Sequence, residues 1–156
     1  MAFIVPVVAF RTLLVTNAAI IAHFAPDAPR IYGTPGIPRA EVQSMPRAAV
    51  TLLQLGGAQN RNIPIGTVTI AMKCYGAQNT LEAMDLYSVI DEVLGDMAAP
   101  VAGRRLQNQQ VPYGAGNCYI YTIHKSTGPM DVMEPVETWP YVWSSYMMMY
   151  WQRVVA

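Results

Sequence analysis

The most constraining stretch of this sequence is residues 63–97, where a strand pattern runs through a turn into a helix pattern. Apolar and polar residues alternate over residues 67–74, which is the period of a half-buried strand. Gly76 marks the turn, and Asn79 with Glu82 has the spacing of a helix-capping box. We therefore expect a sheet with this helix packed across it.

The helix pattern has one apolar and one acidic face. The apolar face consists of Ala83, Leu86, Tyr87, Ile90, Val93, Leu94 and Met97. The opposite, solvent-facing side is expected to carry Glu82, Asp85, Ser88, Asp91, Glu92 and Asp96. Such a division is typical of an amphipathic surface helix, and Pro100 limits its extension.

Other segments give the rest of the fold. Apolar periodicity predicts a first helix over residues 6–24, and strand patterns occur at residues 48–55, 118–125 and 141–154. Segments rich in Pro and Gly or in polar residues are expected to be loops: residues 25–46, 98–116 and 126–140. The sequence thus predicts an α+β fold with a four-stranded, mainly antiparallel sheet, two helices and long Pro/Gly-rich loops. One domain spans residues 1–156.

The final strand pattern, residues 141–154, is apolar on both faces. A strand of this kind is expected to be covered on both sides of its sheet. One cover is a helix. The second is either a neighbouring subunit or another helix of the same chain, and the sequence favours neither.

Charge is scarce and unevenly distributed. The chain has 10 basic and 10 acidic residues, with 53% hydrophobic and 13% charged residues. Zero net charge argues against nucleic-acid binding driven by bulk charge. Residues 74–100 contain five acids and no base, whereas residues 1–73 are predominantly basic. This asymmetry fits either solvated surface or head-to-tail contact between copies.

No catalytic, cofactor or metal site is predicted. His23 and His124 lack further ligands at metal-binding spacing, and Cys74 and Cys118 are expected to be buried thiols. The acids of residues 131–137 fit solvated surface better than an acid/base set. Nucleophile-elbow, phosphate-loop and dinucleotide motifs are absent from the sequence. We also expect neither a signal peptide nor a membrane span.

Four segments carry a family resemblance. They are Arg-Ile-Tyr-Gly at residues 30–33, Cys-Tyr-Gly at residues 74–76, the helix opening at residues 80–90, and an acidic stretch leading to Thr-Trp-Pro at residues 130–140. With these segments the chain resembles the tail terminator family of long-tailed bacteriophages, also called tail completion or tail-to-head joining proteins.

The resemblance implies a structural virion protein without enzymatic activity or cofactor. Such proteins form a ring, usually of six copies, at the head-proximal end of the tail tube. The ring ends tail polymerisation and offers a surface to the head–tail connector or stopper protein. The implied partners are other copies, the tail tube protein, that connector, and genomic DNA passing through the lumen without sequence-specific binding. The implied location is the virion neck, after assembly in the host cytoplasm.

Two groups of residues are predicted to act in such a ring. The subunit interface is expected to join acids of the helix to bases of the next copy: Glu82, Asp85 and Glu92 to Arg39, Arg47 and Arg61. Arg104 and Arg105 are expected near the lumen or the connector.

Two alternatives remain open. A head-completion or stopper protein of the neck shares the general plan. A small ligand-binding domain or enzyme would use His124 or Cys118. A deep pocket with perturbed titratable groups would favour the enzyme, and ring closure would favour either neck protein.

Overall fold

A computed structural model describes residues 3–60, 62–94, 107–131 and 139–156. Within these residues six strands form one sheet in the order β1-β2-β3-β6-β5-β4. The strands are β1 (Ile31–Tyr32), β2 (Ala49–Gln59), β3 (Ile65–Tyr75), β4 (Gln107–Tyr113), β5 (Gly116–Asp131) and β6 (Tyr141–Trp151). The helices are α1 (Pro6–Val15), α2 (Ala18–Phe24) and α3 (Thr80–Leu94), with a 3₁₀ turn, η1, at Val42–Ser44.

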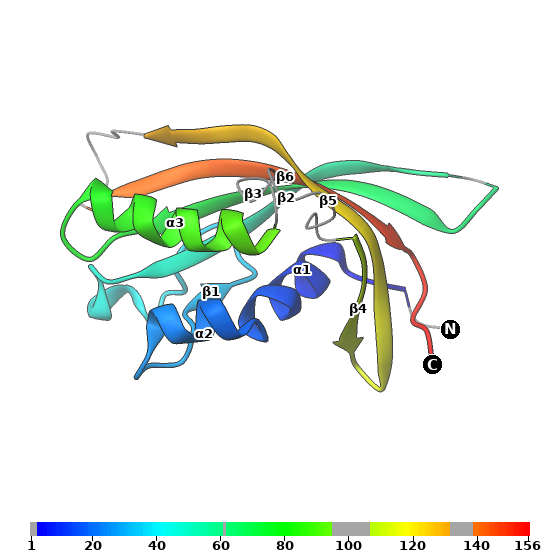
Figure 1. The fold of residues 1–156 in the computed structure, drawn as a ribbon, viewed down its shortest axis with the longest axis horizontal. Coiled ribbons are helices and arrows are strands. Elements are labelled where there is room, and N and C mark those ends of the chain that lie inside the picture. The colour runs from blue at the N-terminus through cyan, green and yellow to red at the C-terminus, as the bar shows by residue number, and fades with distance from the viewer. Residues whose placement is uncertain (1–2, 61, 95–106, 132–138) are drawn as a thin grey trace.

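The sheet is strongly curled into a half-barrel, and all three helices lie on its concave side (Figure 1). Strands β2, β3, β6, β5 and β4 are antiparallel neighbours, whereas β1 is parallel to β2. The turn end of the β2–β3 hairpin extends beyond the helices (Figure 1). We call the helix side the inner sheet face and the other side the outer sheet face.

The predicted strand–turn–helix is confirmed as far as Leu94, whereas Asp96 and Met97 lie outside the described residues. The four alternating residues on the inner face of β3 are buried: Val68, Ile70, Met72 and Cys74. At the start of α3, the Asn79 side chain accepts a hydrogen bond from the Glu82 backbone N–H at 3.0 Å. The Glu82 carboxylate accepts from the backbone N–H groups of Ala77 and Gln78, at 2.8 and 2.9 Å. The turn is therefore fixed by the cap residues of the helix that follows it.

The prediction of one first helix over residues 6–24 is wrong, because the helix breaks at Asn17. The Asn17 side chain accepts hydrogen bonds from the N–H groups of Ala19 and Ile20 at 2.9 and 3.4 Å. That cap starts a second helix, bent by 72° from the first. The bend lets both short helices follow the curled sheet.

The α+β class is confirmed, but the count of four strands and two helices is wrong. Two additional edge strands, β1 and β4, lie within the predicted loops. β1 has only two residues, and β4 reads Gln-Asn-Gln-Gln-Val-Pro-Tyr. Residues 30–33 were expected to form a short strand or a turn, and β1 confirms the strand. Edge strands with one exposed side need little apolar alternation, so β4 gave no strand signal. β5 likewise continues to Asp131, where a loop was expected.

The main hydrophobic core lies between the inner sheet face and the helices. It contains Phe10 and Leu14 from α1 and Leu86 and Ile90 from α3, all at 0% exposure. A second, smaller cluster lies on the outer face around Ala49, Tyr75 and Tyr141. The segment between β1 and β2, residues 33–48, covers this cluster through partly buried side chains that include Ile37 and Met45.

Gly76 is predicted to be essential to the strand-to-helix turn. A Cβ at this position would lie 2.3 Å from the Asn79 carbonyl oxygen and 2.8 Å from the Ala83 nitrogen. Gly76→Ala is expected to lower the free energy of unfolding by about 1–3 kcal/mol, because backbone must move to admit the methyl group. Urea unfolding would measure this loss. Gly36→Ala is the matched control, since a Cβ there meets nothing within 4 Å; equal effects of the two changes would contradict the prediction.

Candidate functional site

The outer sheet face remains largely uncovered by the described residues. β6 places Met147, Met149 and Trp151 on this face, and β2 places Leu53 there, with β3 between the two strands. Leu55 lies at the irregularity of β2 that follows. Leu53 is 40% exposed, Leu55 52% and Met149 38%. The prediction that β6 is apolar on both faces is confirmed, and all three helices lie on the inner face. Of the two covers considered, a second helix of the same chain is thus not found among the described residues.

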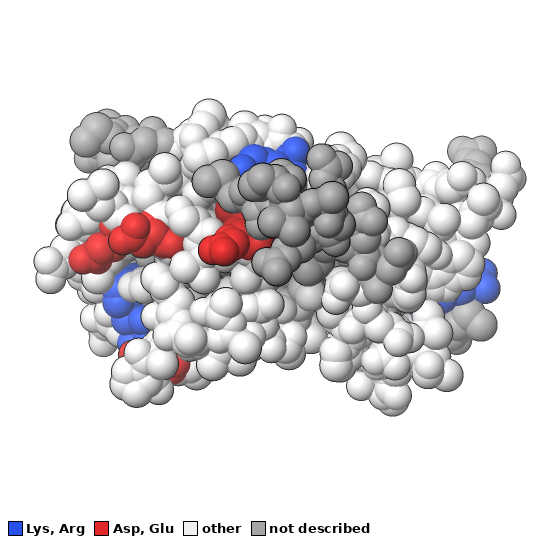
Figure 2. All heavy atoms as spheres, viewed as in Figure 1, with Lys and Arg blue, Asp and Glu red and all other residues white. Residues whose placement is uncertain are grey.

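The second candidate surface is the side of α3 that points away from the sheet. We call it the α3 outward stripe: Leu81, Met84, Asp85, Ser88 and Glu92, all exposed. Two large apolar side chains of α3 lie on this side, Leu81 at 75% and Met84 at 38% exposure. Acidic side chains gather over this part of the surface (Figure 2). The stripe therefore combines apolar contact area with negative charge.

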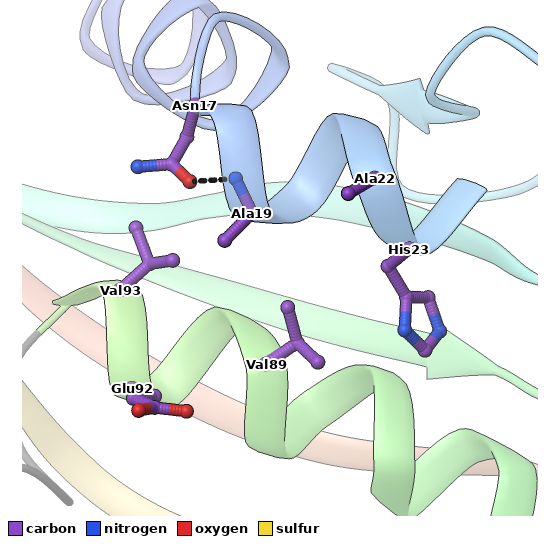
Figure 3. A pocket seen from close by; sticks show the side chains of 7 residues that line it. All are labelled: Asn17, Ala19, Ala22, His23, Val89, Glu92 and Val93. Carbon is purple, nitrogen blue, oxygen red and sulfur yellow. Dashed lines mark hydrogen bonds between the residues drawn. The ribbon is translucent and has the colours of Figure 1, made fainter. Parts of the chain in front are cut away.

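A shallow hollow of about 700 Å³ separates α2 from α3. Val89 and Val93 of α3 face Ala19 and Ala22 of α2, with His23 and Glu92 at the rim (Figure 3). The lining is made of small apolar side chains and is open to solvent. It does not bring nucleophile, base and oxyanion donors together, so the hollow has no catalytic arrangement.

The predicted acidic residues have different roles in the structure. Asp85 and Glu92 are exposed and form no ion pair within the described residues. Glu82 is instead held by the backbone of the turn before α3. Asp85 and Glu92 are therefore the two predicted acids that remain available for a partner.

The predicted basic residues are also divided. Arg47 already pairs with Glu41 at 2.9 Å, between half-exposed side chains. Arg39 is exposed, without an ion pair to any described residue, in the segment that covers one end of the outer face. Arg61, Arg104 and Arg105 lie outside the described residues, so their suggested roles stay predictions.

The prediction that the acidic face of α3 is fully exposed to solvent is wrong at Asp91. It is 0% exposed and points into the core. Its carboxylate accepts a hydrogen bond from the Tyr146 hydroxyl at 2.6 Å and pairs with the Lys125 ammonium at 3.1 Å. The Lys125 ammonium also lies 5.6 Å from the centre of the Tyr87 ring. The partners are 34 and 55 residues away in sequence, so no local pattern could identify them.

The pKa values of Tyr146 and Lys125 in this cluster are both raised. Burial raises the pKa of Tyr146, and the adjacent Asp91 carboxylate raises it further. Burial lowers the pKa of Lys125, but its contacts with Tyr87 and Asp91 outweigh burial, so the net pKa is raised. The cluster joins α3 to β5 and β6 through side chains that contact one another in the core. We therefore expect it to stabilise the packing of the helix on the sheet.

The residues considered for chemistry do not form a site in the described part of the chain. Cys74 and Cys118 are buried, as predicted, and burial raises the pKa of Cys118 to about 11. His124 is exposed on β5. No group of three His, Cys, Asp or Glu side chains in the described residues could hold a metal ion.

Among the described helices, none alone has the length and apolar character to cross a membrane; only α1 and α2 taken together, with their 72° bend, meet that test. In comparisons with known proteins, no protein-family model and no curated protein matches the chain in sequence.

Asp91 is predicted to stabilise the fold strongly. Asp91→Ala leaves the Tyr146 hydroxyl buried without its acceptor and Lys125 without its counter-charge. The free energy of unfolding is expected to fall by about 2–4 kcal/mol, as when one member of a buried pair is removed. Urea unfolding would measure the change. Glu92→Ala, one residue along but exposed, is the control and should stay within about 0.5 kcal/mol of the parent; a similar value for Asp91→Ala would refute the role.

The same cluster predicts loss of stability at alkaline pH. Tyr146 and Lys125 have ordinary pKa values of 10.0 and 10.5, and both are raised in the folded chain. The unfolded chain therefore releases these protons first, so this stability is present below about pH 10 and lost as pH rises further. Urea unfolding between pH 8 and pH 11 would show the decline. Tyr146→Phe should make it shallower, and an unchanged slope would speak against the assignment.

Proposed function

We propose that this chain is a structural protein of a bacteriophage virion that forms a ring at the head-proximal end of the tail tube. In this proposal the ring ends tail polymerisation and provides the joining surface for the head connector. The observation that supports it best is the open outer sheet face. A chain that leaves Leu53 and Met149 exposed on one face of its sheet fits a subunit whose cover is another subunit.

The arrangement of surfaces also supports a ring. The α3 outward stripe and the outer sheet face lie on opposite sides of the molecule, because α3 packs on the inner face (Figure 1). A contact between two different surfaces can repeat from copy to copy and close into a ring. The count of six copies, the tail tube and connector partners, and DNA in the lumen come from the family resemblance. Arg104 and Arg105 are proposed to lie near that lumen or the connector.

The proposal is tested by negative-stain microscopy of phage particles made without this protein. Tails of irregular, excessive length that lie apart from DNA-filled heads are expected, because nothing would stop the polymerisation of the tail tube. Supplying the protein from a plasmid should restore normal tails and joined particles.

Two other results would redirect the proposal. Tails of normal length beside unjoined or leaking heads would place the protein higher in the neck, as a head-completion or stopper protein. Normal, infectious particles would overturn the assembly function, and a search for a ligand or substrate would follow.

A further inference from the structure

We infer that the α3 outward stripe of one copy packs on the outer sheet face of the next copy. This inference rests on the proposed function, because it specifies the contact that would build the ring. The occupant of the outer sheet face is thus a second copy of this chain, and the element that covers it is α3.

The apolar parts of the two surfaces fit each other. A sheet that is apolar on both faces is stable when both are covered, and within the described residues the helices α1, α2 and α3 all lie on the inner face. α3 carries Leu81 and Met84 on its exposed side, at 75% and 38% exposure. The outer face offers Leu53 of β2 and Met149 of β6, on either side of β3. A helix with two exposed apolar side chains therefore meets a sheet face that lacks a helix.

The charges of the two surfaces are complementary. α3 contains no Lys or Arg, and its outward stripe carries Asp85 and Glu92. The described outward side chains of the strands include no Asp or Glu, and Lys73 lies among them beside the pair Leu53 and Ala71. In the segment that covers one end of this face, Glu41 is already paired with Arg47. The Lys73 ammonium is held over the Tyr141 ring, 4.6 Å from its centre. Acid on one surface and base on the other orient a contact and disfavour like-with-like pairing.

Arg39 extends the basic side of this contact. It follows Ile37 by two residues, and Ile37 packs on the cluster at the covered end of the outer face. Asp85 and Glu92 are separated by two helical turns, about 10 Å along α3. In this inference Asp85 meets Lys73 and Glu92 meets Arg39. This retains the predicted acidic helix face and Arg39 and places Lys73 where Arg47 was expected, while Arg61 lies outside the described residues and stays a prediction.

Cysteine crosslinking of mixed copies tests the contact. Leu81→Cys and Leu53→Cys chains, carrying tags of different size, are co-expressed, purified as an assembly and treated with a short bismaleimide. A crosslinked product joining the two tags is expected, and neither variant alone should give a dimer. The native thiols do not interfere, because Cys74 and Cys118 are both 0% exposed.

Ile21→Cys is the matched control, since Ile21 is an exposed apolar residue of α2, outside both surfaces. Paired with Leu53→Cys it should give no crosslink. Dimers from Leu81→Cys alone, or an assembled protein without the mixed crosslink, would overturn this docking and leave the ring proposal standing. A chain that stays monomeric, together with normal particles made without it, would overturn both.

Charge exchange provides a second measurement that does not depend on cysteine geometry. Asp85→Lys and Lys73→Asp are each expected to weaken self-association roughly tenfold, as loss of one close charge pair at an interface does. The double variant should recover most of the parent's association, measured by analytical ultracentrifugation. Additive losses in the double variant would overturn the pairing of these two residues.

Discussion

The constraint on which the rest of this structure depends is the strand β6. It lies in the middle of the sheet, between β3 and β5, and its eleven residues include no charged side chain. Its even-numbered residues from Val142 to Tyr150 face the helices, and its odd-numbered residues face outward. Leaving either apolar face exposed to water therefore destabilises the fold. The helices α1, α2 and α3 cover the inner face, and residues 33–48 cover one end of the outer face.

The buried Asp91 determines which side of α3 faces the core and which side faces the solvent. A carboxylate at 0% exposure is stable only while its hydrogen-bonding partners are in place, here Tyr146 and Lys125. Rotating α3 about its axis would break both contacts, so the cluster fixes which side of the helix faces the sheet. By fixing the inward side of α3, the cluster also fixes the side that faces away from the sheet. The direction of Asp85 and Glu92 is therefore set by an interaction inside the core.

Much of the fold could be predicted from local patterns. The alternation in β3, the cap at Asn79 and the periodicity of α3 are encoded within a few residues of each other, so their prediction is confirmed almost residue by residue. The break at Asn17 was missed, because apolar residues continue at helical spacing on both sides of it. The edge strand β1 could be predicted only as a short strand or turn, because it has two residues, and β4 was missed because it is mostly polar.

The candidate site was less predictable, because the role of a charged side chain depends on neighbours that sequence does not show. Glu82, Asp85, Asp91 and Glu92 look alike in a helical pattern. In the structure Glu82 closes a turn and Asp91 supports the core, while Asp85 and Glu92 stay exposed. Arg47 likewise already forms an ion pair with Glu41, six residues away in the sequence.

These assignments narrow the kind of assembly that the surface can support. An isologous dimer would place the acidic stripe against itself or the apolar sheet face against its own copy, and the first of these brings like charges together. A heterologous contact pairs stripe with face and leaves neither without its complement. Such a contact repeats from copy to copy, and it either closes into a ring or continues as an open filament. In the ring that we propose, both surfaces of every copy would be covered, whereas the end copies of an open filament would each leave one surface exposed.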